Sequence, residues 1–219
     1  MSSILDQIET CNPVLGCTYN CSYCYARKLN NRFHFIPDFS VPTIMPQALK
    51  KIHTRLPKTL FCTSMSDLAD WPEEWRDVVF QEMAKYPRNT YIFLTKRPQM
   101  IDIDTRNMPW LWFGCTVTNS RDKQRITQMK QHIKSANYHV TFEPLHGDVG
   151  RLDLSGIKWI VIGAETGNRA GKIIPRKEWV MRIVEQADRR RIPVFMKDSL
   201  LPIVGETDFR QDNFPWRLF

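Results

Sequence analysis

The chain lacks the features that define several large classes of protein. No stretch of its 219 residues approaches the length and apolarity of a membrane span. Its first residues, Met-Ser-Ser-Ile-Leu-Asp-Gln, have neither the basic start nor the apolar run of a secretory signal. There is no internal repeat, low-complexity tract or Gly/Ser linker, and six cysteines are too few to indicate a disulfide framework. We therefore expect one reduced, cytoplasmic domain spanning residues 1–219, with no membrane partner.

The charge balance is strongly basic. The chain has 31 Lys and Arg against 23 Asp and Glu, a formal net charge of +8. The basic residues are dispersed, with runs at 121–134, 172–177 and 189–191, and such runs are often solvated helix faces. The net balance nevertheless favours nucleic acid or a phosphorylated molecule as substrate. Candidate contacts for such a substrate are Tyr25, Arg27, Arg32, His34 and Trp71.

Short apolar runs alternate with longer amphipathic ones. The runs that read as buried strands are 8–15, 58–63, 90–95, 111–117, 138–142, 158–163 and 192–196. Between them we predict helices that begin at Pro46, at Pro72 with Asp70 as cap, at Asn119 or Ser120, and at Pro175. This alternation implies a parallel sheet with right-handed crossovers. The predicted fold is α/β, a partial or near-complete TIM-like (β/α) barrel, with about 200–219 as a packing tail.

Polar or charged residues follow strand after strand. In a β/α barrel these strand ends converge on one mouth. Taken singly, the Ser, Thr and Asp residues could equally be helix caps. Two glutamates, Glu143 and Glu165, directly end apolar strands, where a carboxylate needs a partner such as a ribose hydroxyl, an adenine amine or a basic side chain. The other residues at the predicted mouth are Ser64, Ser66, Asp67, Lys96, Arg97, Thr116, Thr118 and Lys197.

Three cysteines lie close together, at Cys17, Cys21 and Cys24. Thiolates separated by three and then two residues can point inward from one tight loop, and an iron–sulfur cluster is the kind of group that such a loop surrounds. Three thiolates leave one iron of a four-iron cluster open to a small ligand. Zinc is the alternative, because Cys11 or His34 could complete a four-coordinate site. The protein could then be a non-catalytic metal-binding module.

The C-x3-C-x2-C spacing, with Tyr23 before the last cysteine, resembles the signature of radical S-adenosylmethionine enzymes. The resemblance implies a [4Fe–4S] cluster on the three cysteines, reductive cleavage of S-adenosylmethionine to a 5′-deoxyadenosyl radical, and hydrogen abstraction from a substrate. That substrate would be a nucleic acid or nucleotide, or else a peptide or small metabolite, and flavodoxin or ferredoxin would donate electrons. Within that superfamily, a short family of phages and bacteria, of unknown function, has blocks that resemble 12–17, 63–68, 94–98, 113–117, 142–145, 159–167 and 193–197.

The resemblance also assigns residues to S-adenosylmethionine. The Gly-Gly-Glu stretch that usually holds the methionine amino group is absent, and Ser64, Ser66 and Asp67 occupy its place. The remaining assignments are Lys96 or Arg97 to the carboxylate, Thr116 and Thr118 or Glu143 to the ribose, and Tyr23, Gly163 and Ala164 to the adenine, with Glu165 as a further contact.

Two features of the sequence allow more than one interpretation. Cys62 and Cys115 lie in apolar strands, where a free cysteine is usually a small hydrophobic residue, but Cys115 could instead return a hydrogen atom to a product radical. The aromatic tail at 212–219 would plug one end of the barrel or pack against a partner.

Overall fold

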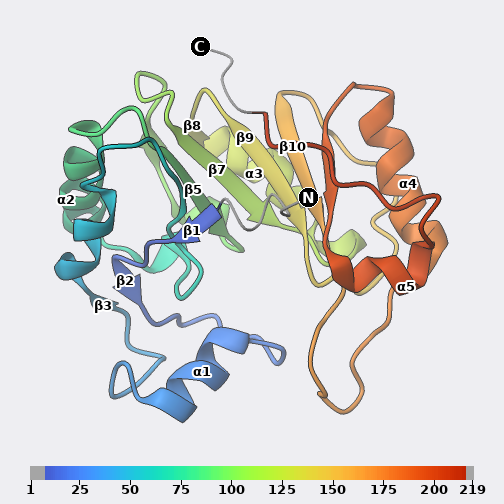
Figure 1. The fold of residues 1–219 in the computed structure, drawn as a ribbon, viewed down its shortest axis with the longest axis horizontal. Helices are drawn as coiled ribbons and strands as arrows, with labels where there is room; N and C mark the ends of the chain where they lie inside the picture. The colour runs from blue at the N-terminus through green and yellow to red at the C-terminus, as the bar shows by residue number, and fades with distance from the viewer. Residues whose placement is uncertain (1–7, 216–219) are drawn as a thin grey trace.

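The computed structural model describes residues 8–215, which form a half-barrel with helices against its outer face (Figure 1). Each neighbouring pair in the seven-stranded sheet is parallel, and the strands follow one another in space in their chain order. Parallel neighbours in chain order require a crossover between each pair of strands, and the predicted partial (β/α) barrel is confirmed. The strands are β1 (Ile8–Thr10), β4 (Thr59–Phe61), β5 (Thr90–Thr95), β7 (Leu111–Thr116), β9 (Tyr138–Phe142), β10 (Ile157–Ile162) and β11 (Val194–Met196).

Smaller elements connect these strands. Two short sheets pair β2 (Val14–Leu15) with β3 (Thr43–Ile44) and β6 (Ile103–Asp104) with β8 (Ile133–Lys134). The α-helices are α1 (Tyr25–Phe33), α2 (Glu73–Ala84), α3 (Gln124–His132), α4 (Lys177–Asp188) and α5 (Leu201–Val204). The 3-10 helices are η2 (Pro46–Ile52), η3 (Leu68–Asp70), η4 (Pro98–Met100), η5 (Ser120–Asp122) and η6 (Asp198–Leu200). Within residues 8–215, no helix has the length and apolarity that crossing a membrane requires.

The first predicted strand is in fact two strands. Residues 8–10 join the main sheet as β1, whereas Val14 and Leu15 pair antiparallel with β3. Pro13 lies between them, and a proline has no N–H to donate to a sheet ladder. The chain therefore leaves the main sheet before the cysteines, and β2 leads directly into their loop.

Several predicted helix starts are displaced. Asp70 does not cap α2, which begins after Pro72 without a side-chain cap, because Asp70 ends η3 and its carboxylate binds Thr18 instead. The segment that begins at Pro46 is a 3-10 helix, and Asn119 caps the short η5 ahead of α3. The sequence patterns gave no prediction for α1, whose N-cap is the sulfur of Cys24.

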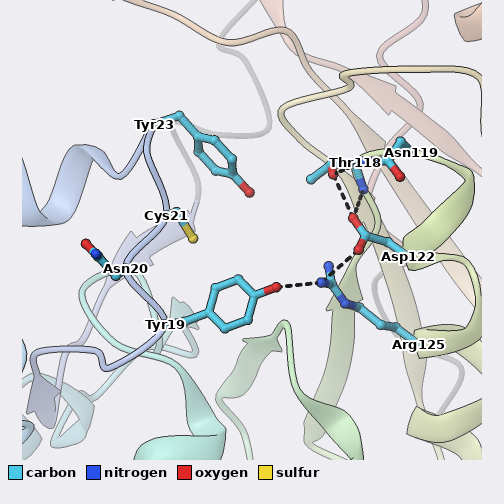
Figure 2. A pocket seen from close by; sticks show the side chains of 8 residues that line it. All are labelled: Tyr19, Asn20, Cys21, Tyr23, Thr118, Asn119, Asp122 and Arg125. Atoms are coloured by element: carbon cyan, nitrogen blue, oxygen red, sulfur yellow. Dashed lines mark hydrogen bonds and ion pairs between the residues drawn. The ribbon is translucent and has the colours of Figure 1, made fainter.

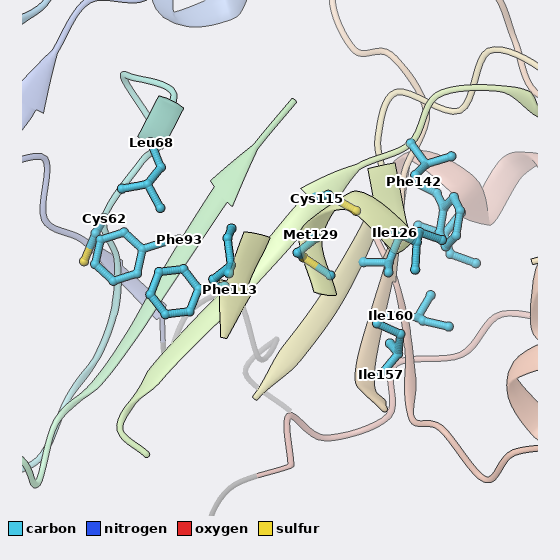
Figure 3. Close-up of a cluster of buried hydrophobic side chains, with 14 of the residues drawn as sticks. Cys62, Leu68, Phe93, Phe113, Cys115, Ile126, Met129, Phe142, Ile157 and Ile160 are labelled. Carbon is cyan, nitrogen blue, oxygen red and sulfur yellow. The ribbon is translucent and has the colours of Figure 1, made fainter. Parts of the chain in front are cut away.

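The outer face of the sheet forms the main hydrophobic core with α2, α3 and α4. Figure 3 shows part of it, with Cys115 of β7 beside Met129 of α3. The Cys115 side chain is fully buried, and burial raises its pKa to about 12. Cys115 thus packs as a small hydrophobic residue on the helix side of the sheet, and its position gives no support to a role as hydrogen donor. Cys62 is also fully buried in this core.

The opposite face carries aromatic residues and one buried histidine. Phe214, from the C-terminal segment, lies 4.7 Å from both Trp112 and Trp159 between ring centroids, so this segment covers the inner face as far as residue 215. The predicted tail residues 216–219 lie outside the described residues. His139 of β9 crosses over Gly114 of β7, and its Nε2 donates to the Phe93 carbonyl on β5 across 3.0 Å.

We expect His139 to make stability depend on pH. Burial lowers its pKa from 6.5 to about 4, although the hydrogen bond to Phe93 opposes that shift. Between these pH values the unfolded chain binds a proton that the folded chain excludes, so stability falls as pH falls from 6.5 to 4, by about 3 kcal/mol at most. Urea unfolding at pH 7 and pH 4.5 measures this loss. The loss should be smaller in His139→Gln, and equal losses in the two proteins would contradict the expectation.

Candidate functional site

The cysteine loop connects β2 to α1, and its first residues are packed closely against neighbouring backbone. Gly16 has φ +99°, and a Cβ there would lie 3.0 Å from the Pro42 Cα and the Val41 carbonyl oxygen. Its N–H donates to the Met65 carbonyl at 2.9 Å, and the Cys17 N–H donates to the Phe39 carbonyl at 2.7 Å. Only glycine combines this φ with so close an approach. The start of the loop is therefore held between residues 39–42, which precede β3, and the chain segment that follows β4.

A buried ion pair anchors the next residue of the loop. The Thr18 backbone and hydroxyl donate to Asp70 at 3.0 and 2.7 Å, and Arg97, which follows β5, pairs with the same carboxylate at 2.7 Å. Only 6% of the Asp70 side chain and 14% of the Arg97 side chain are exposed. Burial alone would raise the pKa of Asp70, but the hydrogen bonds from Arg97 and Thr18 outweigh it and lower the pKa. Thr18 thereby fixes the loop to the end of β5.

Tyr19 joins the loop to the end of β7. Arg125 of α3 donates to the Tyr19 hydroxyl at 2.8 Å and to the Thr116 carbonyl at 2.8 Å, and it pairs with Asp122 (Figure 2). Arg97 also lies over the Tyr19 ring, 5.5 Å from its centroid. A cavity of about 350 Å³ opens between the loop and this strand end. Its lining residues are Tyr19, Asn20, Cys21, Tyr23, Thr118, Asn119, Asp122 and Arg125.

The three loop thiols are half-buried and free of disulfides. The Cys17 sulfur accepts the Tyr19 N–H and the Cys24 sulfur accepts the Arg27 N–H, both at 3.4 Å. Burial raises the pKa of Cys17 to about 12 and also raises the pKa of Cys21, although Lys96 opposes the shift at Cys21.

The predicted adenine contact, Tyr23, links the loop to two further strand ends. Lys96 lies over its ring, 5.8 Å from the centroid, and the His146 ring packs against it edge to face at 5.1 Å. The His146 Nε2 in turn lies 3.1 Å from the Glu165 Oε2, and Glu165 forms a bidentate ion pair with Arg169. His146 thus links the Tyr23 ring to Glu165, whose pKa is lowered chiefly by hydrogen bonds from Arg169.

Glu143 and Lys197 also meet at the mouth. They form an ion pair of 2.5 Å, and a Cβ at Gly163 would lie 3.0 Å from the Glu143 carboxyl group. The Ala164 N–H, predicted to lie beside adenine, donates to the Ser199 hydroxyl at 3.0 Å. The Glu143 carboxylate thus finds the basic partner across the mouth that its position requires.

The two predicted ribose threonines differ. The Thr118 hydroxyl donates to Asp122 at 2.6 Å, and Thr118 lines the cavity. The Thr116 hydroxyl is fully buried and has no hydrogen-bond partner among residues 8–215. Of the two threonines, only Thr118 lines the cavity.

The residues predicted to hold the methionine amino group are engaged internally. The Ser64 hydroxyl donates to Asn12 at 2.9 Å, and the Ser66 hydroxyl accepts the Trp71 indole N–H at 3.0 Å. Trp71 is 2% exposed, so it is a core residue and cannot be the substrate contact that the sequence suggested. Asp67 accepts the Ala69 N–H, the Thr95 hydroxyl and the Lys96 N–H, at 2.9, 2.6 and 2.9 Å. These contacts fasten the end of β4 to the end of β5.

Replacing Asp67 should therefore cost stability. In Asp67→Asn one carboxylate oxygen is replaced by an NH2 group, which cannot accept a hydrogen bond. At least one buried donor therefore loses its acceptor. We expect the free energy of unfolding to fall by about 1–3 kcal/mol. Chemical denaturation measures this loss, with Asp77→Asn on the exposed side of α2 as control. A variant as stable as the control would mean that the three hydrogen bonds do not hold the strand ends.

Sequence reasoning missed several residues that build the site. Thr18 and Tyr19 lie between the cysteines but are not part of the thiol spacing, and His146 follows a predicted strand end by four residues. Arg125 lies one residue before Ile126 of the apolar stripe on α3. The stripe placed Arg125 beside the buried side of α3, but no local pattern indicated its contact with Tyr19.

Comparison with known proteins gives a family but no described activity. A family described as "Protein of unknown function (DUF5131)" matches residues 2–200. No curated protein and no solved structure is significantly similar to the chain. The predicted membership of the radical S-adenosylmethionine superfamily is wrong, because the matching family is a different one. Moreover, residues 8–215 contain no group of three or more His, Cys, Asp or Glu side chains positioned to hold a metal ion.

Proposed function

The chain belongs to the DUF5131 family, and we propose that it is an enzyme that binds an iron–sulfur cluster and S-adenosylmethionine at the mouth of the half-barrel. In this proposal Cys17, Cys21 and Cys24 hold a [4Fe–4S] cluster, and the enzyme abstracts hydrogen from a substrate. One observation carries the proposal. Three free, half-buried thiols share one loop, and that loop is fastened to the carboxyl ends of the parallel strands, where β/α barrels place their active sites.

The donor set fits such a cluster, although the sulfur atoms are not gathered into a metal site in the structure. Cysteine thiolates are the usual ligands of iron–sulfur clusters, and hydrogen bonds to the ligand sulfurs tune their reduction potentials. Cys17 and Cys24 already accept backbone N–H groups. Because the three thiols lie within eight consecutive positions, we expect cluster binding to need only rearrangement within this loop.

Cys17, Cys21 and Cys24 would hold the cluster, which would supply the one-electron reduction that cleaves S-adenosylmethionine to methionine and a 5′-deoxyadenosyl radical, with a reduced flavodoxin or ferredoxin as the source of the electron. The protein's own side chains bind and orient the substrate of this step. Lys96 supplies positive charge for the methionine carboxylate, and the Tyr23 ring offers a flat surface for adenine. Thr118 and Asn119 give the neighbouring cavity hydroxyl and amide groups that suit a ribose.

Anaerobic reconstitution with iron and sulfide tests the proposal. We expect about four irons and four sulfides per chain, an EPR signal after reduction with dithionite, and a change in that signal when S-adenosylmethionine is added. The change in the signal would report contact between the cluster and the added molecule. A chain that retains one zinc ion and no iron would contradict the proposal and favour a structural metal-binding module.

A further inference from the structure

Helix α1 presents an apolar face to solvent next to the cysteine loop. Tyr25, Leu29 and Phe33 recur at every fourth position and are 55%, 37% and 53% exposed, and Phe35, just beyond the helix, is 51% exposed. In Figure 1, α1 projects below the sheet, away from the layer of outer helices. Large apolar side chains gathered on one exposed face commonly mark an interaction surface.

A different side of α1 packs against the rest of the protein. Ala26 is buried with Ile36, Phe39 and Met65 in a small separate core. The Asn30 side chain both donates to the Ile36 carbonyl and accepts the Ile36 N–H, each at 3.0 Å. Leu29, Phe33 and Phe35 take no part in these contacts, so their exposed side chains can change without loss of the fold.

The charge of this surface favours an anionic partner. Residues 25–37 contain three basic residues and His34 but no aspartate or glutamate. Arg27 is used internally, since it donates to the Cys17 carbonyl at 2.9 Å, whereas Lys28 and Arg32 are exposed. The Arg32 guanidinium lies 5.0 Å from the centroid of the Phe33 ring. Positive charge is therefore interleaved with exposed aromatic rings.

This combination fits a single strand of nucleic acid. The Phe33 and Phe35 rings lie 5.7 Å apart and are tilted by 33°, and both are open to solvent. Bases of a single strand stack on such rings while basic side chains contact the phosphates, whereas the bases of a duplex are already stacked on one another. We propose that α1, together with His34 and Phe35, binds single-stranded DNA or RNA.

The position of the surface connects it with the site. The Cys24 sulfur caps α1, and the Tyr25 hydroxyl donates to the Ser64 carbonyl at 2.6 Å. A strand bound along α1 therefore ends beside the cysteine loop. The surface extends the proposed function by naming a macromolecular partner, but binding itself needs neither the cluster nor S-adenosylmethionine.

Fluorescence anisotropy with labelled 12-nucleotide single strands of DNA and RNA, and with the matching DNA duplex, tests this surface on the purified chain. We expect binding that weakens steeply as salt rises and that favours the single strands. The Phe33→Ala/Phe35→Ala variant should bind at least about tenfold more weakly, because it loses both rings on which the bases would stack. The matched control removes two exposed apolar side chains elsewhere, Leu56→Ala/Val78→Ala, and should bind as the wild type does.

Three results would overturn the proposal. These are equal affinity in the aromatic variant and the control, a preference for the duplex, and binding to phosphatidylserine vesicles in place of oligonucleotides. Iron content measured on the same variants separates the two proposals. If the aromatic variant loses oligonucleotide binding but keeps its full iron content, the change has affected only the α1 surface. A wild-type chain that binds oligonucleotides but no iron would overturn only the proposed function.

Discussion

Changing any one of Cys17, Cys21 and Cys24 to alanine is expected to abolish retention of the cluster. Three thiolates are the fewest that hold a four-iron cluster with one open iron, so two remaining ligands should not retain it. Iron per chain after anaerobic reconstitution and desalting should fall from about four to near zero in each variant. The visible absorbance of the cluster should fall in parallel.

The control for these variants is Ser22→Ala, an exposed change within the same loop that removes no sulfur. The Cys→Ala variants should remain folded, because each thiol is only half-buried, and thermal unfolding followed by circular dichroism checks this. Full iron content in a folded variant would show that the cysteine changed there is not a ligand.

Gly114→Ala is expected to have the largest effect on stability. A Cβ at position 114 would lie 2.1 Å from the His139 Cε1, and the ring, which crosses over β7 on the inner face of the sheet, is buried. To avoid this clash the His139 ring would have to move, and it would then lose its hydrogen bond to the Phe93 carbonyl. Overpacking of a core typically costs about 1–3 kcal/mol, and we expect a loss at the upper end of that range or beyond.

Urea unfolding measures this loss, and a second variant identifies its cause. Gly114→Ala/His139→Ala removes the ring that the new methyl group would strike, so it should be more stable than Gly114→Ala alone. A single variant as stable as the wild type, or a double variant less stable than the single one, would contradict the packing described for His139.

The sequence predicted the sheet well because its signal is local. Each buried parallel strand is a short apolar run, and the order of such runs, with helices between them, determines the order of strands in a half-barrel. The split between β1 and β2 was missed, although Pro13 marks it. Helix α1 was missed because its cap is the sulfur of Cys24, which is not among the usual capping groups.

The site was predictable only in part, because its contacts join distant positions. Asp70 has the position of a helix cap in the sequence, yet its carboxylate binds Thr18, 52 positions away. Arg125 reaches Tyr19 across 106 positions. The spacing of the cysteines shows that three thiols share a loop, but the directions of their sulfur atoms depend on the folded loop. A resemblance based on spacing therefore pointed to the wrong family.

Formation of 5′-deoxyadenosine tests the central claim most directly. Reconstituted protein, dithionite and S-adenosylmethionine should be incubated under anaerobic conditions, with and without a single-stranded oligonucleotide, and the products separated by chromatography. We predict 5′-deoxyadenosine and methionine in equal amounts from the wild type and from Ser22→Ala, and neither product from Cys17→Ala, Cys21→Ala or Cys24→Ala. A protein that carries an intact four-iron cluster and forms no 5′-deoxyadenosine in either mixture would contradict the account.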